Sequence, residues 1–116
     1  CHFDANNRII ADAIARTPLD YIEAFTPAPD TDMTLAEARA AWPDKVLWIN
    51  FPSSIHLQPD AAVAQAAYDL IEEAGKVDGL LVGITENMPP ARWEDSCSAI
   101  MDGLDRHARE NVSLYN

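Results

Sequence analysis

The chain has 116 residues, with 19 acidic and 8 basic side chains and a formal net charge of −11, a length that suits one domain or part of one. This charge argues against a nucleic-acid partner, because a nucleic-acid binding face needs clustered lysine and arginine. No apolar stretch approaches the roughly 20 residues that span a membrane, and two cysteines are too few for a disulfide framework. We therefore expect a cytoplasmic protein with reduced thiols that contacts neither nucleic acid nor membrane.

Four short apolar runs, each followed by a helix-like segment, repeat along the chain. They cover residues 1–4, 19–25, 45–51 and 79–85. This βαβαβαβα order predicts parallel strands joined by right-handed crossovers. We expect an α/β fold of four consecutive βα units, the C-terminal half of a (β/α)₈ TIM barrel, with a small doubly wound sheet as the alternative. The polar residues that end every run favour the half barrel, since barrel active sites draw on several strand ends.

Helix signals fill the gaps between the runs. The first helix is expected over residues 6–15, and Thr34 with Glu37 forms a capping box for the second. Pro59 suits the first position of the third helix, and Gly75 suits its end. These signals predict helices that alternate with the strands.

Two apolar stripes predict which helix faces are buried. The first helix carries one stripe, formed by Ile9, Ile10, Ala13 and Ile14. The last helix, expected to start at Pro90, carries another, formed by Trp93, Cys97, Ile100, Met101 and Leu104. We also expect Trp48 in the core, His107 on the surface near a helix end, and residues 111–116 as a frayed tail.

The chain does not open with a methionine, and it begins inside the first apolar run. We therefore expect residues 1–116 to be a single partial domain of a longer polypeptide, with more βα units upstream. A half barrel leaves two sheet edges open, and open edges pair readily with other strands. The expected partners are the upstream half of the same barrel or another copy of the chain, and the isolated half barrel need not be active.

The apolar runs end in His2, Asp4, Glu23, Asn50 and Glu86. His2 and Asp4 are separated by one residue, so on a strand they face the same side, either as a metal-ligand or acid–base pair or as a hydrogen bond that orders the strand end. Glu23 lies in an apolar run, where a lone carboxylate is costly unless it is paired or binds a metal. We expect Glu23 and Asn50 to orient metal ligands or substrate, and Glu86 to bind metal or to cap the last helix.

The loops that follow the runs supply candidate substrate contacts. Ser53 and Ser54 follow the third run, with turn formation as their alternative role, and Asn87 follows the fourth. Arg8 lies early in the first helix, within reach of the same sheet edge. The proline-rich loop over residues 26–32 is long for a βα connection, so we expect it to cover part of a pocket or to form a stiff surface loop.

Three segments at the strand ends follow a known pattern. They are His2-Phe3-Asp4-Ala5-Asn6-Asn7, Asn50-Phe51-Pro52 with Leu57 downstream, and Thr85-Glu86-Asn87-Met88-Pro89-Pro90. In that order they resemble the His-x-Cys-Gly-Asn, Gly-Asn-x-Asp-Pro and Cys-Gly-x-Pro-Pro segments of the uroporphyrinogen decarboxylase (URO-D) superfamily, which includes the cobalamin- or corrinoid-dependent methyltransferases. The resemblance covers essentially the whole chain, as the C-terminal half of the family's barrel.

The resemblance implies metal-assisted methyl-group transfer on a small-molecule substrate, with a corrinoid protein as a further partner. His2 matches a zinc ligand of the methyltransferases, Asp4 stands at the position of one cysteine ligand, and Glu86 or Thr85 stands near the other. Zinc accepts imidazole and carboxylate ligands, and so do manganese and iron. The metal would act as a Lewis acid towards the substrate heteroatom.

Two alternatives stay open. The same family contains a metal-independent decarboxylase of a tetrapyrrole, which would need no cofactor here. A polycarboxylate substrate of that kind needs cationic partners, and Arg8 and Arg92 are the candidates in this chain. The other alternative is a non-catalytic ligand-binding module. Metal content separates the first alternative from methyl transfer, and binding without turnover would indicate the second.

Overall fold

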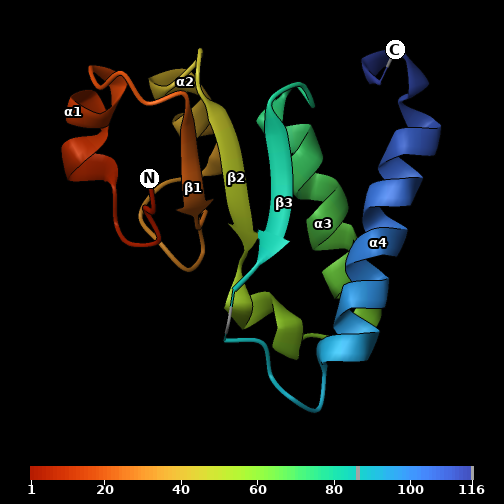
Figure 1. Ribbon diagram of the computed structural model, residues 1–116. Helices are drawn as coiled ribbons and strands as arrows, with labels where there is room; N and C mark the ends of the chain where they lie inside the picture. Colours follow the sequence, from red (N-terminus) through yellow and green to blue (C-terminus); the bar gives the residue numbers. More distant parts are fainter. Residues whose placement is uncertain (86, 116) are drawn as a thin grey trace.

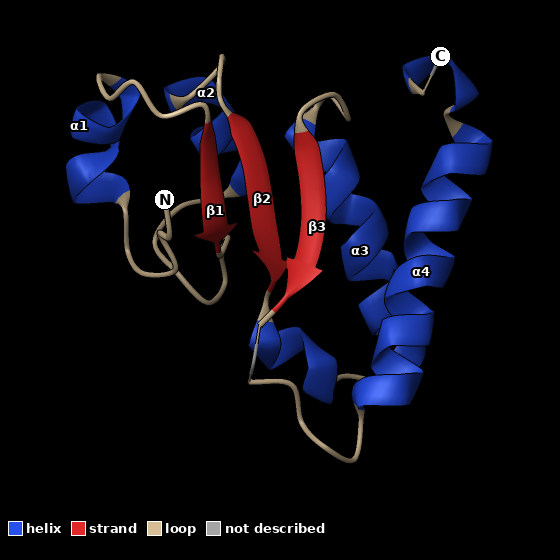
Figure 2. Cartoon of the chain, viewed as in Figure 1, coloured by secondary structure: helices blue, strands red, loops and turns tan. Residues whose placement is uncertain are grey.

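The computed structural model describes residues 1–85 and 87–115, and a parallel sheet forms its centre. The sheet has the order β1-β2-β3 and contains β1 (Tyr21–Phe25), β2 (Val46–Phe51) and β3 (Leu80–Ile84). Residues 1–3, here called the N-terminal strand segment, add a further parallel bridge at the outer edge of β1. There the Phe3 amide donates to the Glu23 carbonyl at 2.9 Å, and the Glu23 amide donates to the Cys1 carbonyl at 2.8 Å. The expected parallel α/β order is confirmed, and the strand arrows in Figure 2 point the same way.

Helical segments connect the strands in the expected alternation. They are η1 (Arg8–Ile10), α1 (Ala11–Ala15), α2 (Leu35–Ala41), η2 (Ser53–Leu57), α3 (Asp60–Ala74), α4 (Trp93–Glu110) and η3 (Val112–Leu114). Figure 1 shows α2 and α3 behind the strands. The molecule measures 39 × 34 × 17 Å. The shortest of these dimensions matches the thickness of one sheet and one layer of helices. None of the described helices is long and apolar enough to cross a bilayer.

One face of the sheet packs on the helices, and the other face is open. On β2, the side chains of Leu47, Ile49 and Phe51 are fully buried against the helices. The open face presents Tyr21, Trp48 and Leu81, which are 47%, 45% and 50% exposed. The prediction that Trp48 lies in the core is wrong, because none of the described elements covers this face. A parallel sheet with helices on one side is compatible with half of a barrel.

Local helix signals are confirmed where a few neighbouring residues determine the structure. The Glu37 amide donates to the Thr34 hydroxyl at 3.1 Å, and the Thr34 amide donates to the Glu37 carboxylate at 2.8 Å. Gly75 ends α3 in the left-handed region, at a φ of +69°. Pro59 is the N-cap of α3 rather than its first helical residue.

The predicted buried stripes of the first and last helices are confirmed only in part, because Ile14 and Ile100 are buried while other members are exposed. Ile9 is 93% exposed and Ile10 is 41% exposed, and they lie on a 3-10 turn that precedes α1. On α4, which starts at Trp93, Met101 is 55% exposed. The buried residues of α4 are Ser96, Ala99, Ile100, Gly103 and His107. Because α3 is the main neighbour of α4, the face of α4 towards α3 is buried, and the apolar residues beside it border a gap next to β3.

Both histidines without a predicted role are fully buried. His56 Nδ1 lies 2.6 Å from the Ser96 hydroxyl, which joins η2 to α4. His107, predicted at the surface, lies with Nδ1 at 2.8 Å from the Tyr115 hydroxyl and Nε2 at 3.0 Å from Glu72 Oε1. The chain after α4 turns back as η3 and places the Tyr115 ring against His107. This packing replaces the predicted frayed tail over residues 111–115.

The buried His56 predicts a pH dependence of stability. Burial lowers the pKa of His56 below its ordinary value of 6.5, against a weaker opposing effect of Asp30. As the pH falls below 6.5, the unfolded chain takes up this proton before the folded chain does, so the free energy of unfolding is expected to decrease. The pKa of His2 is raised, so His2 contributes a dependence of the opposite sign.

Urea unfolding at a series of pH values between neutral and mildly acid measures this effect. The double variant His56→Phe, Ser96→Ala removes the imidazole together with the hydroxyl that it contacts, so no buried hydroxyl is left without its partner. We expect the acid-side loss of stability to be smaller in the double variant than in the wild type. An identical pH slope in both proteins would show that His56 is not the responsible group.

Candidate functional site

A β-bulge in β1 places Glu23 and Phe25 on opposite faces of the sheet. In a regular strand Glu23 and Phe25 would share a face. The register shifts between these two residues, and Ala24 adopts a φ of +61° between them, a backbone conformation that is uncommon outside glycine. Phe25 therefore enters the core, while Glu23 stays on the open face. Bulges of this kind re-aim side chains and are frequent beside active sites.

Glu23 meets His2 across the strand pair. His2 Nδ1 lies 2.6 Å from Glu23 Oε2, and His2 Nε2 lies 3.4 Å from Asp4 Oδ2. The hydrogen bond with Glu23 raises the pKa of His2, desolvation opposes this rise, and the Asp4 carboxylate raises the pKa by a smaller amount. The predicted same-side placement of His2 and Asp4 agrees with this geometry.

A polar pocket of about 140 Å³ lies at the carboxyl ends of the strands. We call it the strand-end pocket, and it is lined by His2, Asp4, Thr26, Asp30, Thr31, Asn50, Ser53, Thr85 and Asn87. Asn50 Nδ2 donates to the Ala24 carbonyl at 3.3 Å, so the bulged backbone also orients this amide. The Asp30 carboxylate accepts hydrogen bonds from the amide and the hydroxyl of Ser54, which holds the loop after β1 against η2.

The structure brings together most of the predicted site residues. His2, Asp4, Asn50, Ser53 and Asn87 line the pocket. Glu23 contacts His2 without lining the pocket itself. The predicted metal ligand Glu86 lies outside the described residues.

Two predicted substrate contacts have other partners. Ser54 is bound to Asp30 and does not line the pocket. Arg8 forms an ion pair with Glu37 at 2.8 Å, and its Nε donates to the Asp32 carbonyl at 3.0 Å. This arrangement ties η1 to the start of α2, and Arg8 is not among the residues that line the strand-end pocket.

Three pocket residues were not singled out by the sequence. Thr26, Asp30 and Thr31 belong to the proline-rich loop, which was expected as a whole to cover a pocket. The length and proline content of the loop were the available signals. Which of its side chains point inwards depends on contacts such as the bond from the Thr31 hydroxyl to the Thr26 carbonyl, at 2.5 Å.

The geometry of His2 and Asp4 suits two ligands of one metal ion. Zinc bonds of about 2.0–2.2 Å at tetrahedral angles place two ligand atoms roughly 3.4 Å apart. His2 Nε2 and Asp4 Oδ2 are 3.4 Å apart. Across the described residues, no group of three or more histidine, cysteine, aspartate or glutamate side chains is placed to hold a metal. His2 and Asp4 are therefore a pair of candidate ligands, and a complete metal site would need further ligands.

A larger groove of about 770 Å³ lies away from this site, between β3 and the last helix. Its walls are mainly apolar, and Asp78 and Asp105 are its acidic residues. Groups able to exchange protons or bind metal gather at the strand-end pocket instead. We therefore place the candidate site at the smaller pocket.

No protein-family model, curated protein or solved structure matches this chain. The resemblance to the URO-D superfamily therefore stays a prediction from the motifs at the strand ends. What the strand-end pocket can bind is therefore inferred from the distances between its side chains and from the carboxylates that line it.

Proposed function

We propose that the strand-end pocket binds a divalent metal ion, with zinc as the first choice, and uses it for methyl-group transfer on a small molecule. The observation that carries the proposal is the different surroundings of the two ring nitrogens of His2. Nδ1 is held by Glu23 at 2.6 Å, and Nε2 lies beside the Asp4 carboxylate at 3.4 Å. Metal-binding histidines commonly have a carboxylate on the nitrogen that does not bind the metal.

The charge of the pocket also favours a cation. Asp4 and Asp30 line it, and the described lining residues include no lysine or arginine. Arg92, a candidate partner for a polycarboxylate, binds Asp60 at 2.6 Å and the Gln58 carbonyl at 3.0 Å. Arg8 is engaged with Glu37. These contacts support metal binding over decarboxylation of a polycarboxylate.

The residues of the chain have distinct tasks in this proposal. Glu23 holds the imidazole of His2 and keeps the proton at Nδ1, which leaves Nε2 as the ligand atom. Asn50 uses its amide nitrogen on the backbone, so its oxygen is left to accept a hydrogen bond from a substrate. A bound metal would supply Lewis acidity towards the substrate heteroatom. The methyl-transfer part rests on the resemblance alone, and a corrinoid protein as methyl carrier belongs to that part.

Metal analysis of the purified protein tests the proposal. After preparation without chelator and loading with zinc, we expect close to one zinc per chain. The double variant His2→Ala, Asp4→Ala is expected to lose this metal. Asp44→Asn, which removes a carboxylate before the amino end of β2, is the control and is expected to retain it. A wild-type protein that stays metal-free under conditions that load a known zinc enzyme would contradict the proposal.

Turnover separates an enzyme from a binding module. The zinc-loaded protein is mixed with a methylcorrinoid as the methyl donor and a thiol as the acceptor. Transfer of the methyl group from cobalt to sulfur, which leaves the cob(I) corrinoid and releases the thiol proton, is followed over time. Methyl loss that depends on His2 supports transferase activity. Binding of the same compounds without methyl loss would indicate a ligand-binding module.

A further inference from the structure

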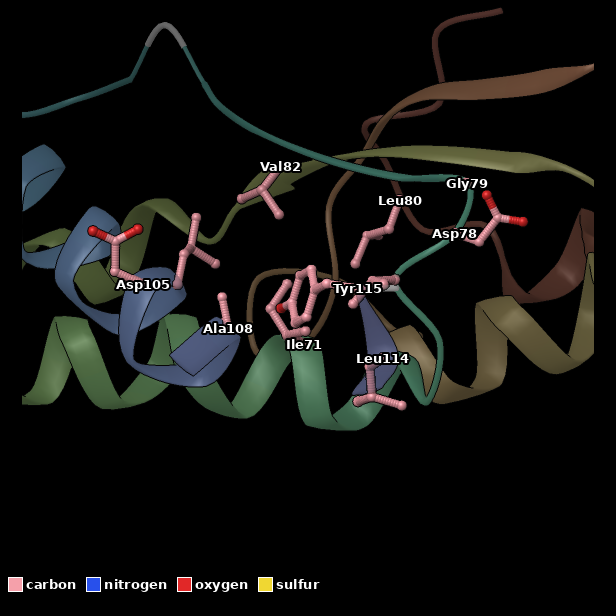
Figure 3. Close-up of a pocket in the computed structure, with 11 residues that line it drawn as sticks. Ile71, Asp78, Gly79, Leu80, Val82, Asp105, Ala108, Leu114 and Tyr115 are labelled. Carbon is pink, nitrogen blue, oxygen red and sulfur yellow. The ribbon is translucent and has the colours of Figure 1, made fainter. Parts of the chain in front are cut away.

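The last strand and the last helix border a groove that takes up no further strand among the described residues. The outer edge of β3 forms one wall, and α4 with η3 forms the other. Figure 3 shows Ile71 of α3, Leu80 and Val82 of β3, and Tyr115 after η3 gathered around this groove. A smaller apolar hollow, with Cys97 and Met101 among its lining residues, continues it along α4. We call the two together the β3 groove.

The β3 groove has the position of a missing strand. In a parallel sheet built from βα units, a helix covers the gap between its own strand and the next one. The next helix would then pack beside α4. This accounts for the 55% exposure of Met101, which lies on the unoccupied side of α4.

The N-terminal end of the chain carries a strand edge left unpaired by the described residues and an exposed apolar helical turn, which together would fit the β3 groove. The N-terminal strand segment pairs with β1 along one edge, and its other edge pairs with no strand in the part of the chain described. The helical turn that follows the segment exposes Ile9 by 93% and Ile10 by 41%. One end therefore offers a parallel strand followed by an apolar helix, and the other end offers a groove for both.

We propose that two copies of this chain associate around a twofold axis and close an eight-stranded parallel barrel. The N-terminal strand segment of each copy lies beside β3 of the other, and η1 with α1 packs on α4. Eight strands make a barrel whose interior side chains can fill. Tyr21, Trp48 and Leu81, each about half exposed on the open face, become this interior. Both sheet edges of each copy are then paired, which removes the edges altogether.

Charge complementarity supports the choice of a second copy as the occupant. Asp78 and Asp105 are exposed at the β3 groove. Arg16 is exposed at the carboxyl end of α1. Helices of βα units run antiparallel to the strands, so the carboxyl ends of α1 and α4 lie at the same level, by the amino ends of the strands. In the closed pair, Arg16 of one copy approaches Asp105 of the other.

The pairing also extends the strand-end pocket. All strand ends of both copies face one mouth, because every strand in the closed barrel is parallel. The end of β3, whose Thr85 lines the pocket of its own copy, also comes beside the His2 and Asp4 pair of the other copy. Each pocket is then completed by its neighbour. The association itself does not depend on metal binding, so it is tested with chelator present.

Sedimentation equilibrium over a wide range of protein concentration measures the association. We expect twice the chain mass of 12.8 kDa. Ile9→Asp is expected to raise the dissociation constant at least roughly tenfold, because an apolar side chain is lost from both contacts. Ile9 is 93% exposed, so the fold of each copy is expected to persist and is checked by circular dichroism. Leu57→Asp alters a residue on η2 that is 69% exposed and is expected to leave the mass unchanged.

Charge reversal tests the arrangement of the two copies. Arg16→Glu and Asp105→Lys are each expected to weaken association, and the double variant that carries both is expected to recover it. A wild-type monomer at every concentration overturns the proposal, and so does growth beyond two copies. An Ile9→Asp variant as dimeric as wild type, or a double variant no better than its single parents, overturns it as well.

Discussion

Replacing Gly103 by alanine is expected to lower the free energy of unfolding by about 3 kcal/mol, at the upper end of the usual cost of overpacking. Gly103 lies in α4 where this helix crosses α3. A Cβ atom at this position would lie 2.1 Å from the Ala64 carbonyl oxygen and 3.0 Å from the Ala67 Cβ. The carbonyl belongs to the backbone of α3, so the clash is relieved only if the two helices move apart. The gain of about 1 kcal/mol in helix propensity from glycine to alanine offsets part of this cost.

Chemical denaturation followed by circular dichroism measures the effect. Gly83→Ala is the matched control, because its Cβ would lie 2.9 Å from the indole nitrogen of Trp48. That indole is half exposed on the open face, so it can rotate away at little cost. We expect a much smaller loss of stability for Gly83→Ala. Equal losses in the two variants would mean that α3 and α4 are not packed as closely as described.

Replacing Glu23 by glutamine is expected to weaken zinc binding by about 10- to 100-fold, the usual cost of losing the carboxylate behind a metal-binding histidine. Glutamine keeps the shape of the side chain but removes the charge that faces His2 Nδ1 at 2.6 Å. The affinity of both proteins is expected to fall as the pH decreases, because a proton competes with zinc for Nε2. Since Glu23 raises the pKa of His2, this fall is expected to begin at a lower pH in the variant.

The two effects separate at high pH, where His2 is neutral in both proteins. Calorimetric titration with zinc there reports the loss of affinity alone, and an NMR titration of the His2 ring reports the pKa. Asp44→Asn, the carboxylate control in the loop before β2, is expected to change neither quantity. Equal zinc affinities on the high-pH plateau would remove Glu23 from the site.

Structure that depends on a few neighbouring residues was predictable from the chain. The capping box of Thr34 and Glu37 and the left-handed end of α3 at Gly75 formed as expected. The same holds for the order of the strands and for the placement of His2 and Asp4 on one side. Each of these features follows from residue types and spacing over a few positions.

Burial was predicted poorly, because it depends on what lies across from a residue. Ile9, Trp48 and Met101 are apolar residues in elements of the expected type, but nothing described here covers them. His107 was expected at the surface and is buried by Tyr115, which folds back after α4. Periodicity identifies an apolar face without saying which neighbour will cover it.

The sequence was sufficient to predict that ionisable and hydrogen-bonding side chains would gather at the carboxyl ends of the strands. It was not sufficient to predict how they interact. The contact between His2 and Glu23 joins residues 21 positions apart, and it depends on the pairing of two strands. The inward orientation of Asp30 depends on its bonds to η2. Local propensities act over one turn or one strand, whereas these contacts form only when distant segments pack together.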